Sequence, residues 1–310
     1  MTNLSRRDLL RGLACGAVAA GMPEPLLALE GLADGRARRP EPGRERLRAW
    51  ARALGEEGLL RDGVPLGRAA ARVGELAAGS PYEAFMLEAY LKAGANPRRR
   101  EPLALSLTRF DCVTLVESCL AVARAAAGSR GPSWDRFARE VERMRYRGGR
   151  RRGYASRLHY FSEWIADGAR RGLVRDLGAE LGGERDPRPL RFMTAHRASY
   201  PALADDAVYE EIGRIERTLD ASPRFVVPAA GLGAVERRIE TGDVLAFATS
   251  IEGLDVSHAA FAWRDGGGVL RVLHAPLSGG VVEVTAATLP EYVAAIRRCT
   301  GVLVARPLPG

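Results

Sequence analysis

Residues 107–120, LTRFDCVTLVESCL, carry apolar side chains at the i, i+3, i+4, i+7 spacing of a buried helix. Cys112 falls in the expected first turn, and Cys119 falls two turns later on the same apolar stripe. Thr108 and Asp111 have the spacing of a capping box before this helix. The stretch therefore predicts a core helix with a cysteine at its N-terminus.

The role of Cys112 has two interpretations. Buried cysteine packs as a small hydrophobic residue, and the stripe favours that role for both cysteines. The first turn of a helix, however, presents free backbone N–H groups and the positive end of the helix dipole, which stabilise a thiolate and lower its pKa. The same N–H groups can hold the oxyanion formed when an amide carbonyl is attacked. Cys112 is therefore a candidate nucleophile that needs a nearby base, whereas Cys119 is expected to remain in the core.

Two of the four histidines are predicted to lie side by side. His258 opens the strand SHAAFAW and His274 closes the strand VLRVLH, and a hairpin loop over 264–268 would place the two residues directly opposite each other. One imidazole can accept a thiol proton while the other fixes its tautomer and orientation. A slip of one residue would put the rings on opposite faces, so the prediction depends on the turn length. Two satisfied core histidines are the alternative.

The order of the remaining patterns predicts the fold class. Helical patterns cover 44–60, 65–80, 81–91, 134–145, 157–170, 206–220 and 289–298, and strand patterns cover 243–249, 257–263, 269–274, 281–284 and 302–307. Helices that precede an antiparallel sheet indicate an α+β protein. We expect one catalytic domain over 44–310, with a helical N-terminal half packed on a small antiparallel sheet.

The N-terminus predicts export. Twin arginines, Arg6 and Arg7, precede a short apolar run that is too brief for a confident membrane span. We therefore expect a twin-arginine signal peptide over 1–30, a linker over 31–43 and a periplasmic mature chain without a stable membrane span. A mature chain with three cysteines leaves at least one thiol unpaired in an oxidising compartment.

The formal net charge of +8 suits an anionic substrate or polymer, although a solvated arginine-rich surface explains it equally well. No nucleic-acid partner is predicted. Four histidines and several acids also raise the possibility of a metal-dependent hydrolase, but no HExxH or HxH spacing is present. A metal site is therefore not expected.

Several motifs together resemble a known family. The pairs Asp111-Cys112, Ser257-His258 and His274-Ala275, the run Gly242-Asp243-Val244-Leu245 and the run Ser278-Gly279-Gly280-Val281 resemble the NlpC-type, papain-like cell-wall peptidases. RFDCVTLVE, SRLHYFSEWI, GDVLAFATSIEGLDVSH and RRCTGVLVARP extend the likeness to the N-acetylmuramoyl-L-alanine amidase-like family of that superfamily, over roughly residues 85–306.

This resemblance implies a papain-like NlpC-type fold with Cys112 as nucleophile, His258 as general base and His274 as orienting residue. It implies hydrolysis of the amide between N-acetylmuramic acid and L-alanine in peptidoglycan or muropeptide fragments, without metal or cofactor. An NlpC-type endopeptidase that cuts between D-glutamate and the diamino acid of the stem peptide, and a wall-binding module without activity, remain alternatives.

The segment SRLHYFSEWI supplies candidate substrate contacts. Arg157 could pair with a substrate carboxylate, while His159, Tyr160 and Trp164 could line a cleft and stack on sugar. Arg109, close to the nucleophile in sequence, is a further candidate. Plain packing is the alternative role for each of these residues.

Overall fold

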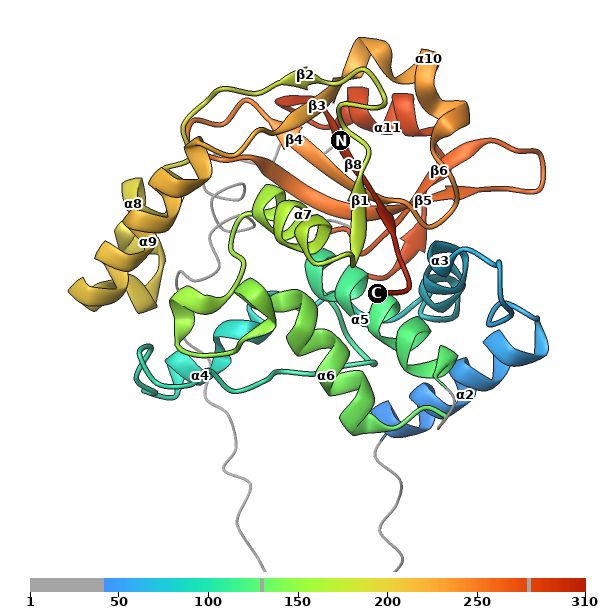
Figure 1. Ribbon diagram of the computed structural model, residues 1–310, viewed down its shortest axis with the longest axis horizontal. Coiled ribbons are helices and arrows are strands. Elements are labelled where there is room, and N and C mark those ends of the chain that lie inside the picture. Colours follow the sequence, from blue (N-terminus) through green and yellow to red (C-terminus); the bar gives the residue numbers. More distant parts are fainter. Residues whose placement is uncertain (1–41, 129–130, 278–279) are drawn as a thin grey trace, which may run out of the picture.

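A computed structural model describes residues 42–128, 131–277 and 280–310 (Figure 1). The predicted signal peptide and nearly all of the predicted linker lie outside these residues, as do Ser278 and Gly279 of the family motif. The first described helix begins at Pro42, so the last two residues of the predicted linker belong to the folded domain.

The described chain combines helices with one antiparallel sheet. The α-helices are α2 (Pro42–Glu56), α3 (Leu66–Leu76), α4 (Ala89–Lys92), α5 (Cys112–Ala127), α6 (Trp134–Arg145), α7 (Phe161–Arg170), α8 (Phe192–Ala195), α9 (Asp206–Asp220), α10 (Leu232–Val235) and α11 (Leu289–Ala295). The short 3₁₀ helices are η1 (Met86–Glu88), η2 (Arg147–Gly149), η3 (Tyr154–Ser156), η4 (Arg197–Ser199), η5 (Pro201–Ala204), η6 (Ala229–Gly231) and η7 (Glu236–Arg238).

The sheet is larger than the sequence pattern predicts. Its strands are β1 (Val174–Asp176), β2 (Glu184–Arg185), β3 (Phe225–Pro228), β4 (Val244–Thr249), β5 (Val256–Arg264), β6 (Leu270–His274), β7 (Glu283–Val284) and β8 (Cys299–Pro307). The order is β2-β3-β8-β4-β5-β6-β7, with β1 paired to β8, and every pairing is antiparallel. Strands β1, β2 and β3 escape prediction because each is too short to show alternation.

Helices cover both faces of the sheet (Figure 1). On one face, α2, α3, α5, α6 and α7 pack with the inward side chains of β4, β5 and β8 in the main core. On the other face, α10 and α11 enclose a second core that contains the opposite side chains of the same strands. A third core joins α8 and α9 to the segment around η3. The result is an α+β fold with a helical lobe beside the sheet.

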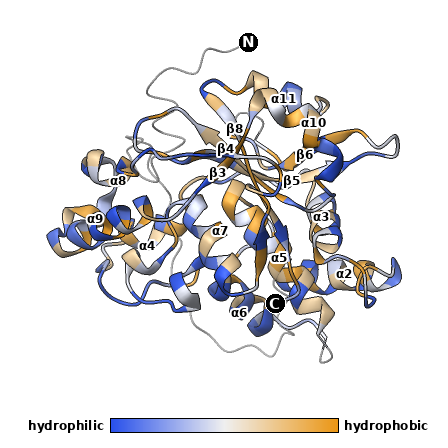
Figure 2. Ribbon diagram, turned by 45° about the horizontal axis from the view of Figure 1, so that its top comes forward, coloured by the Kyte–Doolittle hydropathy of each residue, from blue (hydrophilic) through white to orange (hydrophobic). Residues whose placement is uncertain are grey.

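Helix α5 is buried on all sides, beyond the single apolar stripe that the sequence suggests. Every residue from 114 to 126 is buried, including Glu117 and Arg124. Arg145 of α6 pairs with Glu117 at 2.7 Å, and Arg124 donates to the carbonyl of Leu173 at 2.7 Å. Figure 2 shows hydrophobic residues on α5 and on the strands above it. These contacts fix the position of the N-terminus of α5 relative to the sheet.

The pattern over 81–91 does not form one helix. Pro81 and Tyr82 make isolated bridges with Val281 and Phe110, and only η1 and α4 are helical. The bridge between Tyr82 and Phe110 holds this segment beside the start of α5.

Candidate active site

Cys112 is the first residue of α5. Asp111 caps the helix: its Oδ1 accepts the Thr114 backbone N–H at 2.7 Å, and the Asp111 N–H donates to Thr114 Oγ1 at 2.8 Å. The capping box predicted from Thr108 and Asp111 is therefore wrong by three residues. Capping by Asp111 starts the helix at the cysteine, because the capping residue itself lies outside the helical turns.

The His258 and His274 side chains meet as predicted, but in a different register. The strands pair Phe261 with Leu273 and Arg264 with Leu270, so the hairpin loop covers residues 265–269 and the predicted alignment is wrong by two residues. A shift of two keeps each side chain on its original face of the sheet. His258 Nε2 lies 2.9 Å from His274 Nδ1, and the two rings meet edge to face.

Tyr292 of α11 and Phe247 of β4 surround the two imidazoles. The Tyr292 hydroxyl lies 3.1 Å from His274 Nδ1, and Phe247 stacks against the His258 ring at a centroid distance of 5.7 Å. His274 Nε2 is buried, and its nearest charged neighbour is Glu283 Oε1 at 3.9 Å. The sequence analysis missed Tyr292 because only the fold brings α11 beside β6.

These distances limit the tautomers of the pair. Only one hydrogen fits between His258 Nε2 and His274 Nδ1. When it resides on His258, His258 Nδ1 keeps its lone pair and can accept a proton. His274 then acts as the acceptor that fixes the ring, the role of the third member of a catalytic triad.

The Cys112 thiol lies against strand β5. It is within hydrogen-bonding reach of the backbone of Ala259, the residue after His258, and of the N–H groups of Cys112 and Val113. Cys112 and His258 also line the same cleft. The fold thus brings the helix start and the histidine hairpin together.

Cysteine and histidine are both neutral in this arrangement. Burial, and then the Asp111 carboxylate, raise the pKa of Cys112 to about 12, although the nearby N–H groups oppose this shift. Burial, with a contribution from His274, lowers the pKa of His258 to about 3, and burial lowers the pKa of His274 to about 4. The prediction of a lowered thiol pKa is therefore wrong here, because desolvation outweighs the helix terminus.

The cleft has a volume of about 190 Å³. Its walls come from η1, the start of α5, the segment 154–164, the start of α8 and the β5 strand around His258. Polar atoms of these walls that lack a hydrogen-bond partner among the described residues include the acceptor Glu88 Oε2 and two donors, Trp164 Nε1 and Ser257 Oγ. Trp164 Nε1 and Ser257 Oγ are hydrogen-bond donors in the wall of the cleft that contains Cys112 and His258. Ser257 was not among the predicted site residues.

Four predicted contact residues line this cleft. Tyr160 donates to Glu216 Oε1 at 2.6 Å, His159 Nε2 lies 3.0 Å from the Tyr154 carbonyl, and Trp164 stacks on Phe161. Arg157 also lines it and already pairs with the carboxylate of Glu88 at 2.7 Å.

Arg109 does not line the cleft. Its exposed guanidinium pairs with Glu83 at 2.9 Å. The prediction from closeness in sequence to Cys112 is therefore wrong. Arg109 precedes α5, and its side chain is exposed to solvent.

The carboxylates of the cleft serve structural contacts. Asp255, immediately before strand β5, accepts the backbone N–H of Ser162 at 2.7 Å and so caps the first turn of α7. Asp111 caps α5, and Glu88 pairs with Arg157. Within the described ranges, no three His, Cys, Asp or Glu side chains group as metal ligands.

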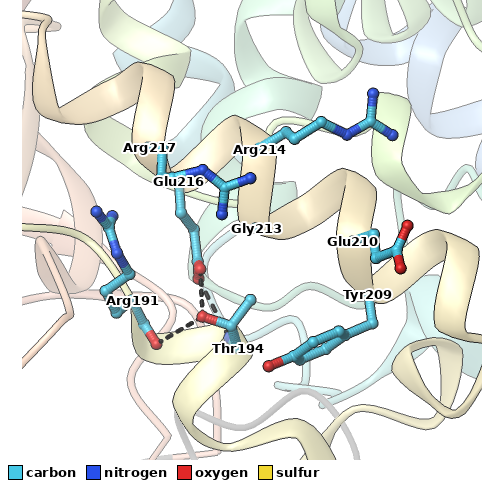
Figure 3. A pocket seen from close by; sticks show the side chains of 8 residues that line it. All are labelled: Arg191, Thr194, Tyr209, Glu210, Gly213, Arg214, Glu216 and Arg217. Carbon is cyan, nitrogen blue, oxygen red and sulfur yellow. Dashed lines mark hydrogen bonds between the residues drawn. The ribbon is translucent and has the colours of Figure 1, made fainter.

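A second hollow, of about 310 Å³, lies on the α8–α9 lobe (Figure 3). Its walls include Thr194 and Arg217, and the buried Glu216 carboxylate below them accepts the Thr194 hydroxyl. It contains none of the predicted catalytic or contact residues. The cleft around Cys112 is therefore the candidate active site.

The three described cysteines, Cys112, Cys119 and Cys299, are free thiols, and Cys119 is fully buried in the core as predicted. None of the described helices is both long and apolar enough to cross a membrane.

Comparisons with known proteins identify the family of this chain. A profile described as N-acetylmuramoyl-L-alanine amidase-like matches residues 72–301. The chain is similar to an N-acetylmuramoyl-L-alanine amidase from Bacteroides uniformis, with 28% identity, a TM-score of 0.71 and coverage of 78% of this chain and 99% of that one. A Bacteroides fragilis protein provisionally named a xylanase has 31% identity and a TM-score of 0.68, with coverage of 76% and 99%.

A Legionella pneumophila protein shares the fold alone, at 19% identity, a TM-score of 0.61 and coverage of 86% and 94%. No curated protein sequence matches the chain.

Proposed function

Because this chain belongs to the N-acetylmuramoyl-L-alanine amidase-like family, we propose that it is a cysteine-dependent amidase. The substrate is a peptidoglycan fragment, cut at the amide between N-acetylmuramic acid and L-alanine. One observation carries this proposal: a cysteine at a helix start shares a cleft with a histidine whose far nitrogen lies 2.9 Å from a second histidine.

In the acylation step, the Cys112 sulfur attacks the lactyl carbonyl carbon while His258 Nδ1 takes the thiol proton. The N–H groups of the first turn of α5 stabilise the oxyanion. His258 then gives its proton to the amide nitrogen, the C–N bond breaks, and the stem peptide leaves with a free amine. Because thiol and imidazole start neutral, proton transfer accompanies the attack.

In the deacylation step, His258 takes a proton from water, and the resulting hydroxide attacks the thioester carbonyl. The C–S bond breaks, the lactyl group leaves as a carboxylic acid, and His258 returns the proton to Cys112. His274 holds the His258 tautomer throughout, and Tyr292 positions His274 through its hydroxyl.

The finer classification and the location of the protein belong to the same proposal. The order Cys112, His258, His274, with the cysteine on a helix and both histidines on the sheet, supports an NlpC-type, papain-like enzyme. The twin arginines support export to the periplasm, with one catalytic domain over 44–310.

Two other hydrolase classes fit the cleft less well. A xylanase needs a pair of carboxyl groups free to act as acid and base or nucleophile, whereas Glu88, Asp111 and Asp255 are engaged in structural contacts. A metal-dependent hydrolase needs a ligand set that the described residues do not bring together.

The test is mass spectrometry of defined muropeptides incubated with the enzyme. We expect release of an intact stem peptide that begins with L-alanine. Release of a fragment that still carries L-alanyl-D-glutamate on the sugar would instead identify the endopeptidase.

The Cys112→Ala variant is expected to fold normally and to release no peptide. Cys119→Ala is the matched control, because it removes a cysteine of the same helix that faces the core, and it is expected to retain activity. Normal turnover by Cys112→Ala would refute the cysteine mechanism.

A further inference from the structure

Two arginine runs that lie fifty residues apart in the sequence are neighbours in the fold. Residues 98–100 follow α4, and residues 150–152 follow η2. The Glu101 N–H donates to the Arg152 carbonyl at 2.6 Å, and the Tyr154 N–H donates to the Pro97 carbonyl at 2.8 Å. These bonds hold the runs side by side as one arginine surface, defined by Arg98, Arg99, Arg100, Arg150, Arg151 and Arg152.

The arginine surface carries an excess of positive charge. Among the described residues, its recorded ion pairs are with only two carboxylates: Asp205 with Arg98, and Glu142 with Arg100 and Arg151. Arg99, Arg150 and Arg152 are exposed and make no ion pair with another residue that the structure describes. Four positive charges are left unbalanced, and guanidinium groups favour carboxylates and phosphates.

The surface adjoins the candidate active site. Tyr154 and Arg157 line the cleft, and Arg152 is only two residues before Tyr154, which is at most about 7 Å along an extended chain. A stem peptide of several residues spans a longer distance than this. A peptide that lies along the Tyr154 wall of the cleft can therefore extend its carboxylates to the surface.

The composition of the surface argues against other partners. Residues 97–100, PRRR, and 150–153, RRRG, contain no aromatic side chain on which a nucleic-acid base could stack. They contain no large apolar residue that could insert into a lipid surface. The arginine surface is therefore suited to the electrostatic recognition of an anion.

We propose that the arginine surface binds the carboxylates of the stem peptide and so makes the enzyme selective for acidic rather than amidated peptides. This inference rests on the proposed amidase function and specifies its substrate. Because the guanidinium groups are solvated, the contribution of each is modest and depends on ionic strength.

The test compares two synthetic substrates, N-acetylmuramyl-L-alanyl-D-glutamyl-diaminopimelate and the same compound with its peptide carboxylates amidated. The readout is the ratio of kcat/KM for the free acid to that for the amide. We expect the Arg99→Gln/Arg150→Gln/Arg152→Gln variant to lower this ratio roughly 3- to 10-fold. We also expect 0.5 M salt to lower the ratio of the parent enzyme.

The matched control replaces three other exposed arginines that form no ion pair within the described part of the chain, as Arg48→Gln/Arg52→Gln/Arg68→Gln. These lie on α2 and α3, across the molecule from α4 (Figure 1), and should leave the ratio unchanged. An unchanged ratio in the first variant, or an equal fall in both, overturns the proposal. Turnover of the amidated substrate by the parent tests the amidase function independently of this surface.

Discussion

Opposing electrostatic effects act on the pKa of the Cys112 thiol. Burial and the Asp111 carboxylate raise its pKa to about 12, while three backbone N–H groups favour the thiolate. His258, the proposed base, also favours its neutral form, since burial lowers its pKa to about 3. A preformed thiolate–imidazolium pair is therefore disfavoured, and reactivity depends on the substrate reaching both groups at once.

Alkylation of Cys112 by iodoacetamide tests this state. We expect the rate to rise about tenfold for each pH unit between pH 7 and 9, because only the thiolate reacts. Peptide mass spectrometry at each pH measures modification at this cysteine separately from Cys299. A rate that is already constant at neutral pH would mean that the ion pair forms in the free enzyme.

Tyr292→Phe tests the positioning of His274. Loss of one hydrogen bond should lower kcat about 2- to 10-fold with little change in KM, because the hydroxyl contacts the imidazole and not the substrate. Steady-state kinetics on a muropeptide gives both constants. Tyr209→Phe, in the hollow on α9, is the control. A raised KM at constant kcat would place Tyr292 in substrate binding instead.

At the scale of elements, two close contacts hold α3 and α7 against the sheet. Gly242, just before β4, has φ of +91°, and a Cβ there would come within 1.9 Å of the Gly67 carbonyl oxygen in α3. In a second contact, Asp255, which immediately precedes β5, caps α7. This contact joins two cleft walls that come from distant parts of the sequence.

Gly242→Ala should destabilise the protein by at least a few kcal/mol, since it combines a left-handed backbone with a backbone clash. Urea unfolding measures the loss. Gly55→Ala in α2 is the matched control, because no atom lies within 4 Å of the added Cβ, and it should gain up to about 1 kcal/mol. Similar stability for both variants would contradict the close approach of α3 to this turn.

At the scale of the whole molecule, the cleft lies where the main core, the sheet and the α8–α9 lobe meet. Tyr160 in its wall donates to Glu216 of α9, and the same carboxylate accepts the N–H of Met193. This contact fixes the lobe against the segment 154–164. Folding also gathers three imidazoles at this site: His159 and His258 are half-buried in the cleft wall, and His274 is buried behind His258.

These histidines predict loss of stability in acid. Burial lowers the pKa of all three below the unfolded value of 6.5, that of His159 also because of the Arg157 charge. Below pH 6.5 the unfolded chain binds protons that the folded chain rejects, so stability falls as pH falls. At pH 5 the loss is about 2 kcal/mol for each of His258 and His274, and His159 adds to it in the same direction.

Urea unfolding at pH 7.5 and pH 5.0 measures this loss. His258→Gln should make it smaller, because one imidazole no longer titrates. Equal stability at the two pH values would show that the rings are protonated in the fold.

The sequence by itself determined the main secondary-structure elements and the candidate catalytic residues. Helix α5, the hairpin with His258 and His274, and the facing of their side chains follow from periodicity, and the 3.6- and 2-residue periods are local properties of the backbone. The likeness to the amidase-like family rested on motifs that are equally local. The error of two residues in the predicted register left the facing of His258 and His274 unchanged, because side chains alternate with a period of two.

Only the tertiary structure decided the protonation and the contacts of those candidate residues. The pKa of Cys112 depends on how far the surrounding chain excludes water, and a helix pattern does not encode this. Tyr292, Ser257 and the position of Arg109 follow from contacts between segments far apart in sequence. The same holds for the joining of the two arginine runs, since packing free energy is a sum over neighbours in space rather than along the chain.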